Sequence, residues 1–357
     1  MSHPKCRDID YIDFLIASPR SASCCEAACS QPPNLVPPSH DAYTRLLTRL
    51  EPDPDVLFAE VEPFINGVLV IDDSTLDHPY AKKIQPVHRH WSGKHKRVVW
   101  GINLISLVWS DGDPTMPVDY RVYDRPVDGL TKNDHFQAML RMAKLRGFAP
   151  RAVLFDSWYS GMENLKLVRD CGWVFLTQLK VNRKADLDRG GYRPIADLPF
   201  DGPSLVVHLQ GFGSVRVFRV VSRDGDTEYW ATNDLGMDEL RRLELAERAW
   251  AIEEYHRSLK QCCNVERCQA RSTRAQRNHI GMAFGRSRGC RGTSTAPGSV
   301  GTNRRPRSCG RQSERIAINH CTKCRYLRNS YVFKLKNFRL NGGTTDHQSV
   351  GISGRPE

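Results

Sequence analysis

The order of apolar and polar positions along the chain predicts a mixed α/β fold. An unbroken apolar run at residues 67–71 is rich in β-branched side chains, which predicts a strand buried on both faces. Two carboxylates, Asp72 and Asp73, stand at the carboxyl end of this run. Successive side chains of a strand point to opposite faces, so only one of the two acids should reach a shared site. The alternative for the pair is a simple turn, since Asp and Ser favour turns.

The next apolar segments predict an antiparallel meander that continues from this strand. Residues 98–109 and 116–123 are the two further strands, and a turn at residues 111–114 separates them. A helix is then predicted from Asn133 or Asp134 to Arg146, because apolar side chains recur there at helical spacing.

A parallel part of the same sheet is predicted further along the chain. Residues 152–155 form a short buried strand that ends in Asp156, and a helix at 162–170 and a strand at 173–179 follow. This alternation of strands and helices implies parallel strands, and the carboxyl ends of such strands meet at one edge. We therefore expect Asp73 and Asp156 to lie at that edge.

A long helix is predicted from Asp238 to about Cys263. Its apolar stripe should pack on the sheet, and Glu253, Arg257 and Lys260 share a different face at spacings of four and three residues. The alternative is an ordinary amphipathic helix with a Glu–Arg pair within it.

Changes in composition divide the chain into three regions. Residues 1–60 form a small helical region, which is either a DNA-reading module or a prefix that packs on the main domain. Residues 61–284 form the α/β domain, with a β-rich insertion at 180–234. Apolar periodicity is lost in residues 285–357, which we assign no fold; a shifted reading frame or a basic nucleic-acid-binding arm are the two interpretations.

Charge adds little until it is examined locally. The net charge is +12, yet residues 285–357 alone hold 15 Lys+Arg and 3 Asp+Glu, so the rest of the chain sums to zero. The overall charge is therefore poor evidence for nucleic-acid binding. A local basic, His-rich segment is more informative, and we interpret it either as a phosphate-contacting loop or as a solvated charged hairpin. Its basic residues are Lys82, Lys83, Arg89, Lys94, Lys96 and Arg97.

Cysteine placement and hydropathy indicate a soluble intracellular protein. The twelve cysteines do not form a disulfide framework, so most are expected to be reduced thiols. The longest apolar run is too short to span a membrane, and the first residues do not resemble a signal peptide. We expect a cytoplasmic location without membrane association.

Three stretches of sequence together resemble the DDE transposases of bacterial insertion sequences. They read Val-Leu-Val-Ile-Asp-Asp73-Ser-Thr, then Val-Leu-Phe-Asp156-Ser-Trp-Tyr-Ser, then Trp-Ala-Ile-Glu253-Glu-Tyr-His-Arg-Ser-Leu-Lys260. The third resembles the Tyr-Arg-Glu-Lys signature of one branch, and Lys260 fits it. The signature's Arg and Tyr fall on Ala249 and Ala246, with Arg248 as the nearest arginine.

The resemblance implies an RNase H-like mixed sheet flanked by helices and a magnesium-dependent enzyme. Two Mg²⁺ ions, with Mn²⁺ as a substitute, would be held by Asp73, Asp156 and Glu253, and Asp72 is the alternative to Asp73. Asp73 would bridge both ions, Asp156 would bind one, and Glu253 would complete the second ion or orient water. The candidate DNA contacts are Lys260, Arg257, Arg248, Lys94, Lys96 and Arg97.

The resemblance also implies the reaction and the partners. Water would nick the end of the element, and the freed 3′-hydroxyl would attack target DNA. The partners would be the terminal inverted repeats, the target DNA and a second copy of the chain, in a nucleoid-associated complex. Two other classes stay open: an impaired transposase that only binds DNA, and a different RNase H-like nuclease.

Overall fold

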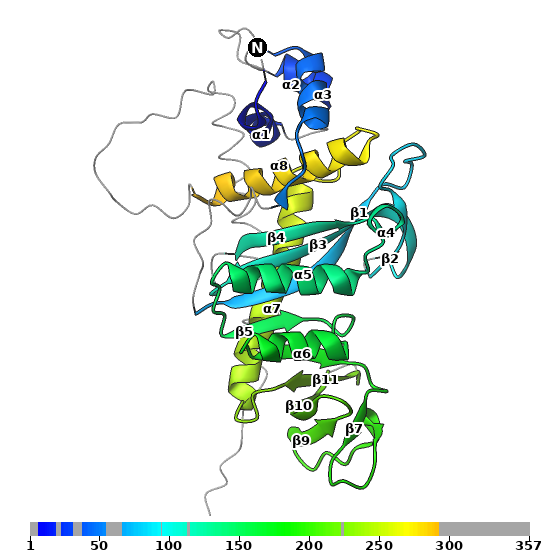
Figure 1. Cartoon of the computed structure of the whole chain (residues 1–357), viewed down its shortest axis with the longest axis vertical. Coiled ribbons are helices and arrows are strands. Elements are labelled where there is room, and N and C mark those ends of the chain that lie inside the picture. Colours follow the sequence, from blue (N-terminus) through cyan, green and yellow to red (C-terminus); the bar gives the residue numbers. More distant parts are fainter. Residues whose placement is uncertain are drawn as a thin grey trace, which may run out of the picture. The chain divides into compact units, whose positions relative to one another are not determined.

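A mixed sheet of eleven strands runs through the part of the chain that the computed structural model describes (Figure 1). The described residues are 6–18, 23–30, 38–54, 66–93, 95–112, 115–222 and 225–292, without the side chains of residues 16, 17 and 286–292. The strands are β1 (Val68–Asp77), β2 (His88–Ser92), β3 (Arg97–Ser110), β4 (Thr115–Tyr123), β5 (Ala152–Phe155), β6 (Phe175–Leu179), β7 (Lys184–Asp186), β8 (Arg193–Pro194), β9 (Ser204–Leu209), β10 (Gly213–Val221) and β11 (Thr227–Thr232).

Strand β1 is the centre of this sheet. It pairs antiparallel with β3 and parallel with β5, and β5 pairs parallel with β6. Strand β3 carries both β2 and β4 on its other edge, so the predicted meander is present. Strand β11 pairs antiparallel with β6, and the β-rich insertion therefore extends the same sheet. The predicted mixed sheet flanked by helices is confirmed.

Helices cover both faces of the central strands (Figure 1). Helices α5 and α6 contribute side chains to one core, and α7 contributes side chains to the core on the other face. None of the described helices is both long and apolar enough to cross a membrane. Their bounds are α1 (Asp8–Ala17), α2 (Cys24–Cys29), α3 (His40–Arg49), α4 (Arg125–Asp128), α5 (Lys132–Leu145), α6 (Met162–Asp170), α7 (Glu239–Cys262) and α8 (Thr273–Gly292), with a short 3₁₀ turn, η2, at Ile195–Asp197.

The apolar start of β1 is buried on both faces, as its composition predicts. Val68 and Val70 lie in the core beneath α7, whereas Leu69 and Ile71 lie in the core beneath α5 and α6. Gly67 precedes the strand because a Cβ there would overlap the indole of Trp109. The strand continues to Asp77, so Asp72 and Asp73 lie within it and not at its exit. Pairing with β3 extends over the whole strand, which explains why the two acids do not open a turn.

Two further helix boundaries differ from those expected, and the interpretation of the basic segment is resolved in part. Helix α5 is capped by Thr131, whose hydroxyl accepts from the Asp134 amide while the Asp134 carboxylate accepts from the Thr131 amide. From His88 onward the basic segment forms the β2–β3 hairpin, whereas Lys82 and Lys83 lie before it, and phosphate contact by this segment stays a prediction. Helix α8 passes Phe284, where apolar periodicity ends, and its backbone continues to Gly292.

The N-terminal helices pack on α8. The Tyr11 hydroxyl of α1 lies 3.0 Å from Nδ1 of His279 in α8, and Asn278 donates to the carbonyls of Leu47 and Leu50 near the end of α3 at 2.8 Å each. These contacts are those of a prefix that packs on the main domain. A DNA-reading role for this region stays a prediction.

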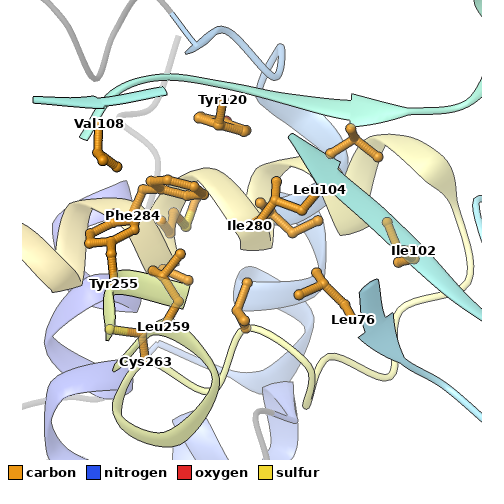
Figure 2. Close-up of a cluster of buried hydrophobic side chains, with 14 of the residues drawn as sticks. Leu76, Ile102, Leu104, Val108, Tyr120, Tyr255, Leu259, Cys263, Ile280 and Phe284 are labelled. Carbon is orange, nitrogen blue, oxygen red and sulfur yellow. The ribbon is translucent and has the colours of Figure 1, made fainter. Parts of the chain in front are cut away.

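The middle of α8 closes the core on the α7 face of the sheet, as Figure 2 shows. Phe284 is fully buried and stacks on Tyr120 of β4, with ring centroids 4.5 Å apart. Its other ring neighbour is Tyr255 of α7, at 5.8 Å. Phe284 therefore links the sheet, α7 and α8.

Phe284→Ala should destabilise the protein by about 3–5 kcal/mol, because it removes a buried ring and leaves a cavity. Urea unfolding followed by circular dichroism measures this change. Leu240→Ala on α7 is the control, because that side chain is 67% exposed and should change stability by less than about 0.5 kcal/mol. Equal stability of the two variants would contradict the packing described for α8.

His279 makes the attachment of α1 sensitive to acid. Its Nε2 lies 3.1 Å from the Asn264 carbonyl, which can only accept, so Nε2 carries the proton and Nδ1 accepts from Tyr11. Burial lowers the pKa of His279 from 6.5 to about 4, and the bond to Asn264 opposes this shift. The unfolded chain therefore binds a proton that the folded chain excludes between these two values.

The contribution of His279 to the free energy of unfolding, at most about 3 kcal/mol, should be fully present above pH 6.5. It should be lost as the pH falls toward 4. Free energies of unfolding at pH 7.5, 5.5 and 4.5 test this. His279→Gln should be less stable at pH 7.5 but lose less stability on acidification. A parallel loss in both proteins would assign the acid sensitivity to other groups.

Candidate active site

Asp73 is held by three hydrogen-bond donors on the α5 face of the sheet. Its Oδ2 accepts from Nζ of Lys132 at 2.8 Å and from Nδ2 of Asn103 at 2.7 Å. Its Oδ1 accepts from the hydroxyl of Tyr159 at 3.1 Å. The side chains of Asp73 and Lys132 are each only 18% exposed, so their attraction is weakly screened. Both oxygens of Asp73 are thus engaged by the protein itself.

Asp72 lies on the opposite face of β1, toward α7. Alternation along the strand places it with Val70, which packs in the core that also contains Ile252 and Tyr255 of α7. Burial is the main cause that raises the pKa of Asp72 well above its ordinary value. The other causes are repulsion from Asp73, Asp156 and Glu253, in that order. Repulsion from all three other carboxylates therefore contributes to the raised pKa of Asp72.

Asp156 directly follows β5, the strand parallel to β1. The residue is exposed, although neighbouring protein atoms still remove part of the hydration of its carboxyl. That loss of hydration, followed by repulsion from Asp73, raises its pKa, while the backbone amides of Trp158 and Tyr159 oppose the shift. Glu253 is an exposed residue of α7.

The carboxylates share a neighbourhood without forming a closed cage. Among the residues that the structure describes, no group of three or more His, Cys, Asp or Glu side chains is placed to hold a metal ion. The carboxylate oxygens of these acids are nevertheless the type of ligand that a hard divalent cation prefers, and such a cation would relieve the repulsion between them.

The predicted basic residues fall at three places. Lys260 of α7 donates to the Thr75 carbonyl of β1 at 2.7 Å and lies 3.4 Å from Glu266. Arg248 and Arg257 are half-buried positions of α7. Lys96 and Arg97 are exposed in the β2–β3 hairpin, and Lys94 lies outside the described residues.

The partners of Asp73 were not found from the sequence. Asn103 was visible as a polar residue within the apolar run of β3, which was a usable signal because buried polar groups require partners. Tyr159 follows Asp156 by three residues, within the stretch that carried the family resemblance. Lys132 gave no signal, since the first turn of a helix often carries charged residues.

The described fold is that of an α/β protein with acidic residues on β1, directly after β5 and on the covering helix α7. Residues 65–285 match the family model "Transposase DDE domain", and the chain belongs to this family. The protein is therefore a DDE transposase, an enzyme of the nuclease and transesterase class. The family as a whole depends on divalent metal ions.

Two solved structures resemble the chain at low identity. The piggyBac transposase synaptic complex with hairpin DNA is 12% identical, with a TM-score of 0.48, over 90% of this chain and 75% of that one. The Drosophila P element transposase strand transfer complex is 13% identical, with a TM-score of 0.28, over 54% of this chain and 48% of that one. Neither is close enough to support an assignment of residues. Among curated proteins, none matches the sequence.

Breaking the Asp73–Lys132 pair should destabilise the fold, because either partner alone leaves a poorly hydrated charge. Lys132→Met and Asp73→Asn should each cost about 1–3 kcal/mol, and the double variant should cost less than their sum. Thermal and urea unfolding of the four proteins give the coupling energy. Strict additivity would show that the pair does not interact in solution.

Proposed function

We propose that the transposase cuts and joins DNA with Asp72, Asp156 and Glu253 as its acidic residues. The observation that carries this proposal is geometric: alternation along β1 places Asp72 on the face of the sheet that is covered by α7, the helix of Glu253. Asp73, the acid preferred from the family pattern, is instead neutralised by Lys132 on the other face of β1. The position of Asp72 on the α7 face, and the pairing of Asp73 with Lys132 on the other face, support Asp72 as the first acid of the triad.

Asp72, Asp156 and Glu253 would hold the divalent ions, with Mg²⁺ as the natural choice and Mn²⁺ as a substitute. When bound, two such ions would lower the pKa of an attacking water and stabilise the negative charge on the leaving oxygen. The carboxylates fit this task because they are hard oxygen donors from a rigid strand, a strand end and a helix. Asp73 would act as a positioning residue that fixes β1 against α5.

Lys260 supports the site by fixing α7 to β1. Its ammonium donates to the Thr75 carbonyl, three residues beyond Asp72, and Glu266 accepts from the Asp77 amide at 3.2 Å while also lying near Lys260. These contacts make Lys260 a positioning residue in the protein without DNA. Arg257 and Arg248 remain candidate phosphate contacts on the same helix.

The substrate would be the ends of a mobile element, followed by target DNA, with a second copy of the chain bringing two ends together. Trp158 is 58% exposed beside Asp156, and the ammonium groups of Lys132 and Lys180 lie 5.6 and 5.7 Å from its ring centroid. Positive charge beside the acids would attract the phosphates next to the cut.

Cleavage of labelled DNA carrying the inverted repeats that flank the gene tests this proposal. Asp72→Asn and Asp156→Ala should each reduce nicking at least about 100-fold in Mg²⁺, because each removes a carboxylate ligand. Asp73→Asn should retain a larger share of activity, once its lower stability is controlled by assaying well below its melting temperature.

The opposite ranking, with Asp73→Asn inactive and Asp72→Asn active, would return the first position to Asp73. Specific binding without any nicking by the parent protein would instead indicate a DNA-binding protein that has lost its chemistry. Cleavage of branched DNA regardless of its sequence would indicate a different nuclease.

A further inference from the structure

The β2–β3 hairpin has one anchored face and one exposed face. Cross-strand pairs match Arg89 with Trp100 and Trp91 with Val98, so these four side chains share a face. Trp91 is 65% exposed, Val98 56% and Trp100 46%, and Arg89 is also exposed. Two large aromatic rings on an exposed ribbon form an unusual surface for a globular domain.

The other face fixes the hairpin to the end of β4, near the Asp73–Lys132 pair. Nε2 of His88 donates to the carboxylate of buried Asp124 at 3.0 Å, and the ring of His90 lies 6.0 Å from that of Tyr123. Tyr123 in turn lies 5.7 Å from the ammonium of Lys132, which binds Asp73. Contacts on its inner face therefore hold the hairpin near the Asp73–Lys132 pair on the α5 side of β1.

The charge of this segment is one-sided. Between Asp77 and Asp111 the sequence contains no acidic residue, while it carries six lysines and arginines. Arg97 and Lys96 are exposed at its turn, and Arg89 lies 5.4 Å from the ring centroid of Trp100. The chain outside the C-terminal region is otherwise balanced in charge, so this excess is local. It favours a polyanion over a second protein surface.

We propose that the exposed face of the β2–β3 hairpin binds DNA with unpaired nucleotides, outside the acidic centre. Trp91 and Trp100 provide planar surfaces for stacking bases, and Arg89, Lys96 and Arg97 contact the flanking phosphates. The inference rests on the proposed function only in taking DNA as the ligand. It extends that function by assigning the hairpin a preference for unpaired or distorted DNA near the cut.

Fluorescence anisotropy without metal tests the proposal apart from cleavage. The full chain is titrated against a labelled duplex with an unpaired 3′ extension and against the same duplex with blunt ends. Trp91→Ala and Trp100→Ala should each weaken binding to the extended DNA by about 5- to 150-fold, with a smaller effect on the blunt duplex. Because stacking releases few counterions, the salt dependence should stay unchanged.

Charge variants should behave differently from the tryptophan variants. Lys96→Gln and Arg97→Gln should weaken both DNAs and reduce the slope of log affinity against log salt by up to about 0.9 for each phosphate that is no longer neutralised. Leu145→Ala, 80% exposed on α5, is the control and should bind as the parent does. Trp91→Phe should restore most of the affinity, which separates stacking from a folding defect.

Two results would overturn the inference. Unchanged DNA binding by Trp91→Ala and Trp100→Ala would show that the exposed face is not a DNA surface. Loss of a dimer in these variants, measured by light scattering without DNA, would assign the face to a second copy of the chain. Asp156→Ala should keep the binding and its dependence on Trp91, so failure of the catalytic proposal is recognisable separately.

Discussion

The structure depends on the burial of a charged strand between two apolar layers. Val68 and Val70 anchor β1 in one core, and Leu69 and Ile71 anchor it in the other, so the strand cannot shift by one residue without exchanging its faces. The same alternation then sends Asp72 and Asp73 to opposite sides. Each carboxylate loses hydration there, and the groups around it must offset that free-energy cost.

The two acids meet this cost in different ways. Asp73 is matched by Lys132, Asn103 and Tyr159, which supply a charge and two further hydrogen bonds. Asp72 lies on the α7 face, and its pKa is raised first by burial and then by repulsion from Asp73, Asp156 and Glu253. A compensated acid stabilises a fold, whereas an uncompensated cluster stores unfavourable energy that a cation would release. This difference is the physical reason to place the chemistry on the α7 side.

Much of the fold could be predicted from the sequence, because period-two and period-3.6 patterns report burial directly. The buried start of β1, the strand before Asp156 and the long helix from Asp238 all follow from such patterns. The choice between Asp72 and Asp73 could not, since alternation separates two side chains without saying which face meets the third acid. That information comes from the packing of α7, which depends on contacts far apart in the chain. Lys132 was hidden for the same reason, because its partner lies 59 positions away.

In the hairpin, as in β1, side chains alternate between two faces, but one face of the hairpin is open to solvent. Its period of two gives inward histidines that hold it against the end of β4 and outward tryptophans that stay exposed. A ribbon kept only for stability would gain more by turning those rings inward, since burying a tryptophan is strongly favourable. Exposed rings on an anchored segment whose lysines and arginines are not balanced by acids are instead suited to a ligand with planar groups and negative charge. In β1 both sets of alternate positions are anchored in the cores, whereas in the hairpin only one set is anchored and the proposal assigns the other set to DNA.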